Sequence, residues 1–457
     1  MSGFGGAARR LVSGWGLAMP TAAEVRQPAD VAALTKAIVD HDRRGVIARG
    51  LGRAYGDAAQ NAGGVVLDTT ATGASSVRVE DGTITVPAGT SLDTLIARLV
   101  PQGYFVPVSP GTRYVTVGGA IAADIHGKNH HRDGSFANHV RSLRMALPDG
   151  DVVEIGPGPG QDPELFWATA GGMGLTGVVL DATIAVPAIE TSLVLVDTDR
   201  APDLDSVMAL MDEGDERYHY SVAWIDLMAS GRSMGRSVLT RGDFAPLDAL
   251  PAGRRGDPLR PPGTRLVPAP PAPNGLLNKL TVRLFNEFWF RKAPARRRDE
   301  LQTIPQFWHP LDMVDRWNRL YGPRGFLQWQ SVVPFGEEAT LRRIVESLSN
   351  AGLPSFLAVL KRFGPGNPGP LSFPLPGWTL ALDLPVAHSV ELATLLDDLD
   401  REVVDAGGRI YLAKDSRLRP ELLPKMYPRL DEWRAVRHAV DPGRTLQSDL
   451  ARRLDLV

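Results

Sequence analysis

The chain has 457 residues, a formal net charge of −2, 43% apolar residues and no cysteine. This length suits two or more domains with sizeable cores, and the near-neutral charge gives no reason to expect nucleic acid. Without cysteine there are no disulfides, zinc–thiolate sites, iron–sulfur clusters or thiol nucleophiles, and no apolar run is long enough to span a membrane.

The first elements lead into a glycine-rich loop. Apolar spacing predicts a helix over residues 28–40, followed by a short buried strand at 46–48. Residues 49–57 then carry three glycines, Gly50, Gly52 and Gly56. Such a loop can direct successive backbone N–H groups at one anion, although a tight surface turn has the same pattern.

Two Asp-Gly pairs predict hairpins, one around residues 81–82 and one around 149–150. The first would join strands at 76–80 and 83–86, and an amphipathic helix is expected at 90–99. These features favour antiparallel pairing in the first half of the chain.

A second glycine cluster follows an expected helix at 164–170 and precedes an expected strand at 178–186. It contains G-x-G-x-x-G, from Gly172 to Gly177. A nicotinamide-binding Rossmann site needs a strand before this motif and a helix after it, and here the order is reversed. We therefore expect no such site.

Residues 116–131, TVGGAIAADIHGKNHH, combine paired glycines, a small apolar run and three histidines. Glycines without Cβ allow a ligand to approach the backbone, which suits a flat cofactor with polar edges. His126 and His130 could bind zinc if they lay on one helix, but Gly127 and Asn129 are poor helix formers. We expect no metal.

The second half alternates strands and helices. Strands are predicted at 326–333, 355–361 and 378–384, and helices from Leu341 to near Gly352 and over 389–405. This pattern indicates an antiparallel sheet covered on one side by helices. The other face would carry polar side chains of a pocket floor: Gln328, Gln330, Lys361 and Thr379.

The segments ARGLGRAYGD, PGTRYVTVGGAIAADIHG and GGMGLTG resemble the flavin domain of the vanillyl-alcohol-oxidase-type family. The resemblance implies an α+β fold with a PCMH-type FAD-binding domain at 1–190, completed by 409–457, and a substrate domain at 191–408. The matching cofactor positions are Ala48, Arg49, Gly50, Leu51, Gly52, Arg53, Ala54, Tyr55, Gly56, Asp57, Ala58, Gly111, Thr116, Val117, Gly118, Gly119, Ala123, Asp124, Ile125, His126, Val178, Tyr411 and Lys414. Some relatives tether the flavin through a histidine or a cysteine, and this chain has Tyr55 near the first place and no cysteine. Non-covalent FAD is expected.

Longer blocks, including DIHGKNHH, FWHPLDM, FGPGNPGPLSFPLPGW and AKDSR, resemble the branch of this family that oxidises the ribose C2′ hydroxyl of a polyprenyl phosphate sugar. The resemblance implies that a base takes the hydroxyl proton, and His126 and Lys414 are both candidates. The substrate positions that it implies are Lys128, Trp224, Trp308, Asn318, Gln328, Gln330, Lys361, Thr379 and Ala381.

This chain departs from the branch at two positions. Many relatives have a cysteine where it has Ala381, and the matching asparagine is Thr379. Turnover should survive without the thiol, because hydride transfer does not need one, but covalent trapping by electrophilic inhibitors should be lost.

The resemblance also implies partners: a polyprenyl-phosphate ribose, a separate NAD(P)H-dependent reductase that completes the epimerisation, and a membrane surface. The protein would be cytoplasmic or periplasmic and peripherally associated. The proline-rich residues 251–273 and the segment 312–325 would be mobile and admit the lipid. The alternatives are an aldonolactone- or alditol-type oxidase of soluble sugars, a non-catalytic lipid-binding protein and an NADPH-dependent flavin reductase.

Overall fold

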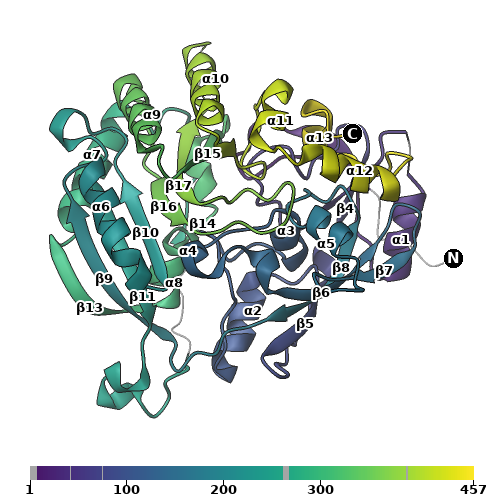
Figure 1. The fold of residues 1–457 in the computed structure, drawn as a ribbon, viewed down its shortest axis with the longest axis horizontal. Coiled ribbons are helices and arrows are strands. Elements are labelled where there is room, and N and C mark those ends of the chain that lie inside the picture. The colour runs from purple at the N-terminus through teal and green to yellow at the C-terminus, as the bar shows by residue number, and fades with distance from the viewer. Residues whose placement is uncertain (1–7, 42, 75, 261–266, 387–389) are drawn as a thin grey trace.

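A computed structural model of the chain describes residues 8–41, 43–74, 76–260, 267–386 and 390–457. Figure 1 shows two parts side by side: the N-terminal part with two small sheets, and a part built on one large sheet. The last helices return over the N-terminal part, so both ends of the drawn chain lie on that side.

The first small sheet has strand order β1-β2-β4-β3 and is mixed. β2 and β3 both run parallel to β4, whereas β1 is antiparallel to β2. Its elements are β1 (Ala8–Val12), β2 (Thr21–Arg26), α1 (Val31–Val39), β3 (Val46–Arg49) and β4 (Val65–Asp68). Leu34 and Ile38 of α1 pack on Val46 and Leu67, as the helical spacing predicts.

The second small sheet has strand order β5-β8-β6-β7 and is antiparallel. Its strands are β5 (Thr83–Pro87), β6 (Val140–Ala146), β7 (Val152–Ile155) and β8 (Val178–Ala185). The helices on it are α2 (Leu92–Leu99), α3 (Val117–Ala122) and α5 (Pro163–Thr169). Because α5 precedes the second glycine cluster and β8 follows it, the reversed order predicted from sequence is confirmed.

One of the two predicted hairpins is present. β6 and β7 pair around Gly150, but residues 76–79 form no strand, and Glu80 makes only an isolated bridge to Thr83. The Asp81-Gly82 turn itself is tight, with positive φ at both residues. β5 is the edge strand of the second small sheet, where it pairs with the distant strand β8.

The large sheet has eight strands in the order β13-β9-β11-β10-β16-β17-β15-β18. They are β9 (Leu193–Ala201), β10 (Tyr220–Ile225), β11 (Ser237–Phe244), β13 (Arg296–Thr303), β15 (Phe326–Pro334), β16 (Ala358–Phe363), β17 (Gly377–Pro385) and β18 (Arg409–Ile410). All recorded pairings are antiparallel. Three helices cover one face with leucine-rich stripes: α6 (Leu204–Gly214), α9 (Glu338–Ala351) and α10 (Val390–Asp405). The predicted sheet with a helical cover on one side is confirmed, and Gly352 ends α9 in the left-handed region as expected.

The remaining elements surround the junction between the two parts. They are α4 (His130–Asp133), α7 (Lys279–Lys292), α8 (Ile304–Trp308), and the two-stranded parallel pair β12 (Val267–Pro268) and β14 (Val314–Asp315). Of the proline-rich stretch expected to be mobile, residues 261–266 lie outside the described residues. No finding bears on that expected mobility.

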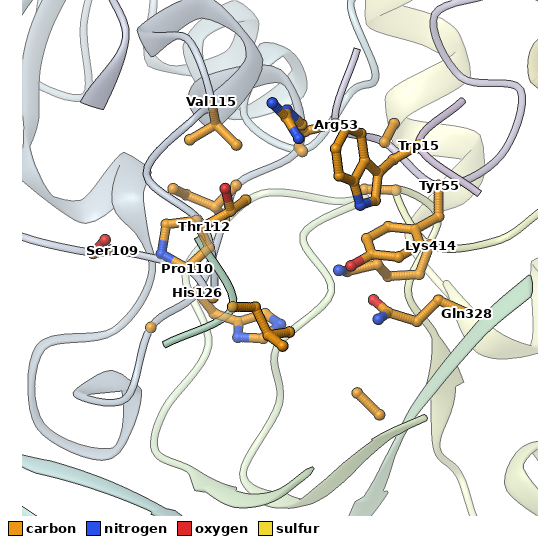
Figure 2. Close-up of a pocket in the computed structure, with 18 of the residues that line it drawn as sticks. Trp15, Arg53, Tyr55, Ser109, Pro110, Thr112, Val115, His126, Gln328 and Lys414 are labelled. Atoms are coloured by element: carbon orange, nitrogen blue, oxygen red, sulfur yellow. The ribbon is translucent and has the colours of Figure 1, made fainter. Parts of the chain in front are cut away.

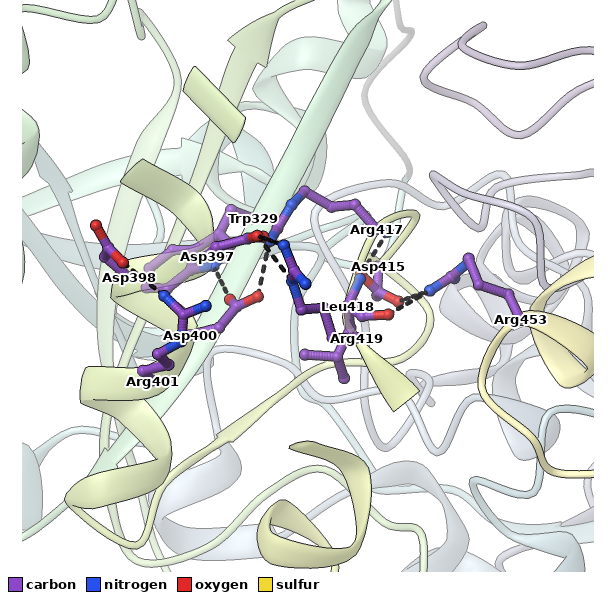
Figure 3. Close-up of polar contacts among 10 residues, drawn as sticks. All are labelled: Trp329, Asp397, Asp398, Asp400, Arg401, Asp415, Arg417, Leu418, Arg419 and Arg453. Carbon is purple, nitrogen blue, oxygen red and sulfur yellow. Dashed lines mark hydrogen bonds and ion pairs between the residues drawn. The ribbon is translucent and has the colours of Figure 1, made fainter. Parts of the chain in front are cut away.

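The C-terminal segment joins both parts through ion pairs. It carries α11 (Leu423–Met426), α12 (Leu430–Val440) and α13 (Asp449–Arg453). Arg453 lies 2.8 Å from Asp57 in the first glycine loop and 2.9 Å from Asp415. Figure 3 shows the pair of Arg453 with Asp415 beside a second pair, in which Arg417 joins Asp400 of α10 at 2.7 Å.

Candidate active site

A cavity of about 980 Å³ lies between the two parts of the molecule. Binding sites for organic ligands commonly enclose roughly 300–1,000 Å³, so this one suits a large ligand or two adjoining ones. Figure 2 shows Tyr55, Lys414 and Gln328 on one side of it and His126 and Pro110 facing them.

The first glycine loop presents unused donors to the cavity. Residues 50–55 line it, and within the described chain no hydrogen bond uses the backbone N–H groups of residues 50–54. Arg53 is mostly buried, and its guanidinium lies 3.8 Å from the centre of the Trp15 ring. Consecutive free N–H groups beside a buried cation form an anion-binding concavity, which fits a pyrophosphate.

Close packing explains why this loop needs glycine. A Cβ on Gly50 would lie 2.2 Å from Oγ1 of Thr116, and Gly52 has φ of +65°. Thr116 caps α3 by accepting a hydrogen bond from the N–H of Gly119 at 3.2 Å. The first and second glycine segments therefore converge on the same wall of the cavity, as a flat ligand requires.

Asp124 shapes the backbone just before His126. Its φ is +38° and its carboxylate is fully buried. The carboxylate accepts hydrogen bonds from the Ser135 and Ser372 hydroxyls and the Ala137 N–H. Asp124 does not line the cavity, so its role in the structure is to hold this turn.

His126 is held by a chain of hydrogen bonds that begins at Thr379. The Thr379 hydroxyl donates to the carbonyl of Ser331 at 2.9 Å, so it can only accept from the Gln330 amide at 3.1 Å. Gln330 Nε2 then donates its other hydrogen to His126 Nε2, 2.9 Å away. The proton of a neutral His126 consequently sits on Nδ1.

Nδ1 of His126 lies 3.1 Å from Nζ of Lys361. If Nδ1 carries the proton, it donates a hydrogen bond to Lys361 Nζ. Only a neutral amine can accept that hydrogen bond. Burial, followed by the charges of Lys414 and Lys128, lowers the pKa of Lys361 to about 7, which makes the neutral amine accessible. Burial holds the pKa of His126 well below its usual range, so the imidazole is neutral.

Three half-buried lysines face this cavity: Lys128, Lys361 and Lys414. Burial lowers the pKa of Lys128 to about 7 and also lowers the pKa of Lys414, which nearby Asp383 partly offsets. Among the described residues, none of the three amines lies within salt-bridge distance of a carboxylate. Because buried cations need a counter-charge, the cavity is built for an anionic ligand.

Lys414 has the least constrained amine of the three. Its Nζ lies 3.9 Å from the centre of the Tyr55 ring, and no hydrogen bond of the described chain uses it. By contrast, Lys128 donates to the carbonyl of Phe307, and Lys361 faces His126. Lys414 is therefore free to exchange a proton with a bound ligand.

Most residues expected at the site line the cavity. They are Ala48, Gly50, Leu51, Gly52, Arg53, Ala54, Tyr55, Ala58, Gly111, Thr116, Gly118, Gly119, Ala123, Ile125, His126, Lys128, Val178, Trp224, Trp308, Gln328, Gln330, Lys361, Ala381, Tyr411 and Lys414. The residues from the large sheet come at two-residue spacing on the face that the helices leave free. The predicted polar pocket floor is thus present.

Seven expected residues do not line the cavity: Arg49, Gly56, Asp57, Val117, Asp124, Asn318 and Thr379. Arg49 donates to the carbonyl of Ser13 at 2.8 Å, and Asn318 donates to the carbonyl of Trp15 at 3.0 Å. Thr379 reaches the cavity only through Gln330. These side chains support the walls of the cavity.

Sequence reasoning missed several lining residues. Trp15 reaches the cavity from the β1–β2 connection, and α7 contributes Phe285, Trp289 and Lys292. The clustered aromatic and basic residues of α7 were a usable signal, whereas nothing local marks Trp15 as a partner of Arg53.

The histidines near His126 have separate surroundings. His130 packs on Phe363 with ring centres 4.4 Å apart, and His131 donates to the carbonyl of Tyr218.

Across the described ranges, no group of three or more His, Cys, Asp or Glu side chains is arranged to hold a metal ion. In the same ranges, no helix has the length and apolarity to cross a membrane.

Comparison with known proteins gives matches to the whole chain and to its N-terminal part. Residues 20–156 match the FAD binding domain family. Over 451 residues, covering 97% of each chain, the protein is 46% identical to "Decaprenylphosphoryl-beta-D-ribose oxidase" of Mycolicibacterium smegmatis. It is 44% identical over 378 residues to an uncharacterized protein of Streptomyces coelicolor, covering 80% of this chain and 100% of that one. "L-gulonolactone oxidase 3" of Arabidopsis thaliana is 28% identical over 109 residues, covering 23% of this chain and 19% of the relative.

Proposed function

Because the chain belongs to the decaprenylphosphoryl-beta-D-ribose oxidase family, we propose that it oxidises the ribose C2′ hydroxyl of decaprenylphosphoryl-β-D-ribose to the 2′-keto sugar. The FAD binding domain and the PCMH-type α+β architecture support FAD as the cofactor. A separate NAD(P)H-dependent reductase would then reduce the keto sugar to the arabinose epimer.

One observation carries this proposal. Three half-buried lysines that have no carboxylate partner among the described residues share a cavity with a loop whose N–H groups make no hydrogen bond in the same residues. The loop fits the FAD pyrophosphate. Lys128, at the far side beside Phe307 and Trp308, fits the phosphate of the lipid. Gln328 and Gln330 offer their amide oxygens to the sugar hydroxyls, because their amide nitrogens already donate within the protein.

When bound, FAD supplies a two-electron acceptor for oxidation of the alcohol. The protein must remove the hydroxyl proton, and Lys414 is the better candidate of the two residues left open by the sequence. Its amine is unengaged and its pKa is lowered by burial, whereas both ring nitrogens of His126 have partners. His126 would orient Lys361 and the sugar.

A non-covalent flavin follows from the residues at the tethering positions. The chain has no cysteine, and Tyr55 stands near the place where some relatives have a tethering histidine. After acid precipitation of the purified protein, the yellow flavin should stay in the supernatant. Colour in the pellet would contradict non-covalent binding.

Anaerobic addition of decaprenylphosphoryl ribose should bleach the flavin absorbance and yield a 2′-keto product by mass spectrometry. A panel of soluble aldonolactones and alditols tests the alternative oxidase on the same fold. Bleaching by the soluble sugars alone would favour that alternative, and colourless protein would remove the flavin from the scheme.

To separate the two candidate bases, Lys414→Met and His126→Gln should be compared by single-turnover flavin reduction. We expect Lys414→Met to slow reduction by about 100-fold or more and to remove the rise of rate with pH. His126→Gln should retain that rise. The reverse pattern would assign the proton to His126.

A further inference from the structure

The amphipathic helix α7 (Lys279–Lys292) leaves an apolar ridge uncovered beside the cavity. Leu280, Leu284 and Phe288 follow each other at four-residue spacing, and their exposures are 68%, 63% and 61%. Side chains at this spacing form one stripe along a helix. Exposed large apolar side chains grouped in this way mark an interaction surface.

The opposite side of α7 is fixed to the fold. Val282 and Asn286 are buried, and the Asn286 amide donates to Asp226 at 2.7 Å and to the carbonyl of Ser355. A capping box at Asn278 starts the helix. These contacts fix the orientation of α7, so the apolar ridge stays exposed on the opposite side of the helix.

Cations outnumber carboxylates on the helix that carries the ridge. The helix carries Lys279, Arg283, Arg291 and Lys292 against the single carboxylate of Glu287. Glu287 is already paired with Arg291 and with Arg236 of the neighbouring loop. An apolar stripe on a helix with an excess of cations is the pattern of helices that lie in the interface of anionic lipid membranes.

The same helix forms part of the cavity wall. Phe285, Trp289 and Lys292 line the cavity, one helical face away from Leu284 and Phe288. Figure 1 places α7 on the side of the large sheet, away from both drawn ends of the chain. A lipid whose head group occupies the cavity could leave along this wall and enter a bilayer under the ridge.

We propose that α7 docks the protein on an anionic membrane surface, with Leu280, Leu284 and Phe288 inserted among the lipids. The inference rests on the proposed function for its lipid substrate, but the docking itself does not need turnover. Charge complementarity favours a membrane over an apolar protein partner, because the one carboxylate of α7, Glu287, is already paired with Arg236 and Arg291.

The test uses the full-length flavoprotein and sedimentation with vesicles of phosphatidylcholine alone or with added phosphatidylglycerol. Wild type should bind the anionic vesicles more tightly, and high salt should weaken this binding. Leu284→Glu combined with Phe288→Glu should lower the binding about tenfold or more. Leu11→Glu with Leu247→Glu is the matched control, since both side chains are exposed and lie outside α7.

Activity separates this inference from the proposed function. Neither Leu284 nor Phe288 lines the cavity, so the double variant should oxidise a short-chain ribosyl phosphate at the wild-type rate and long-chain substrate in vesicles more slowly. Two results of the vesicle assay would overturn the docking proposal: unchanged binding by the double variant, or equal binding of wild type to both vesicle types. A wild-type dimer in light scattering that the double variant abolishes would overturn it as well. Vesicle binding without oxidation of either substrate would instead contradict the proposed function.

Discussion

Two neighbouring groups of buried charges are treated in opposite ways in this molecule. In the network of Figure 3, Asp415 is paired with Arg453, and Asp400 is paired with Arg417. One residue before Asp415, Lys414 faces the cavity with no salt bridge in the described chain. The charges of the Figure 3 network are paired within the protein, whereas the charge of Lys414 is available to a ligand.

This difference teaches how to separate a structural cluster from a binding site. In a buried ion pair the two charges compensate each other, so neither is available to a ligand. Removing one partner destabilises the folded protein, because the other charge stays buried and unpaired. A buried cation without a partner is costly by itself and becomes favourable when an anion arrives. Mutations in the two groups should therefore have opposite effects on the ligand-free protein.

The largest effect is expected from Arg453→Ala. It leaves Asp57 and Asp415 without their guanidinium, and the free energy of unfolding should fall by roughly 3–5 kcal/mol. Flavin occupancy should fall with it, because Asp57 belongs to the first glycine loop. Urea unfolding and flavin absorbance measure both effects.

Arg434→Ala is the control for this change, since its partner Asp431 is 93% exposed and the pair should be worth less than about 1 kcal/mol. Equal losses in the two variants would show that the network adds nothing beyond an ordinary surface pair.

The opposite sign is expected from Lys361→Met. Removing a half-buried amine that has no salt bridge, and whose charged form is disfavoured there, should leave the flavin-free protein as stable as wild type or more stable. The same change should raise KM for the ribosyl substrate by about tenfold or more, since the amine that faces His126 beside the sugar is lost. A clear loss of stability in the flavin-free form would place Lys361 with the structural charges.

The pH dependence sharpens the same contrast. The folded-state pKa values of Lys128 and Lys361 are about 7, far below the unfolded lysine value of 10.5. Between these values the unfolded chain binds more protons, so the stability of the flavin-free protein should rise with pH from about 7.5 to 9.5. Unfolding experiments across this window should show a shallower rise for Lys361→Met than for wild type.

A smaller effect is expected from Thr379→Val, which removes the acceptor that orients Gln330. We expect kcat/KM to fall roughly fivefold, about the value of one neutral hydrogen bond, with a shift in its pH profile. Thr379→Ser should restore both, because serine keeps the hydroxyl. If valine and serine behave alike, the hydroxyl does not position His126.

The smallest effect concerns Ala381, which lines the cavity opposite Gln330 across β15 and β17. Ala381→Cys should leave turnover within about twofold of wild type, since volume changes little. It should, however, make the enzyme sensitive to irreversible inactivation by thiol-directed electrophiles. Inactivation of the wild type by the same reagents would point to another nucleophile.

The sequence predicts the site best where its geometry is local. The glycine loop at 50–54 and the alternation of Gln328 with Gln330 are local patterns, and both reach the cavity. Asp57 was expected at the cofactor, but its partner Arg453 lies 396 positions away. Nothing in the neighbourhood of either residue encodes that pairing.

Other parts of the fold escape prediction for the same reason. The Asp81-Gly82 turn forms as predicted, but the strand expected before it does not. Instead, β5 pairs with β8, about 100 positions away in the chain, which no local pattern near β5 indicates. The opposite environments of Lys414 and Asp415 arise at a turn after β18, where Lys414 faces the cavity beside Tyr55 and Asp415 pairs with Arg453. Only tertiary packing distinguishes such neighbours.

The ion pair between Asp57 and Arg453 also bears on the order of events during biosynthesis. The wall that receives the nucleotide is finished only when a segment 396 residues downstream has emerged from the ribosome and folded back. A nascent chain that already contains every glycine-rich loop would still lack this ion pair. Flavin should therefore be acquired after translation of the downstream segment, and cells short of the vitamin should accumulate a fully made but open apoprotein.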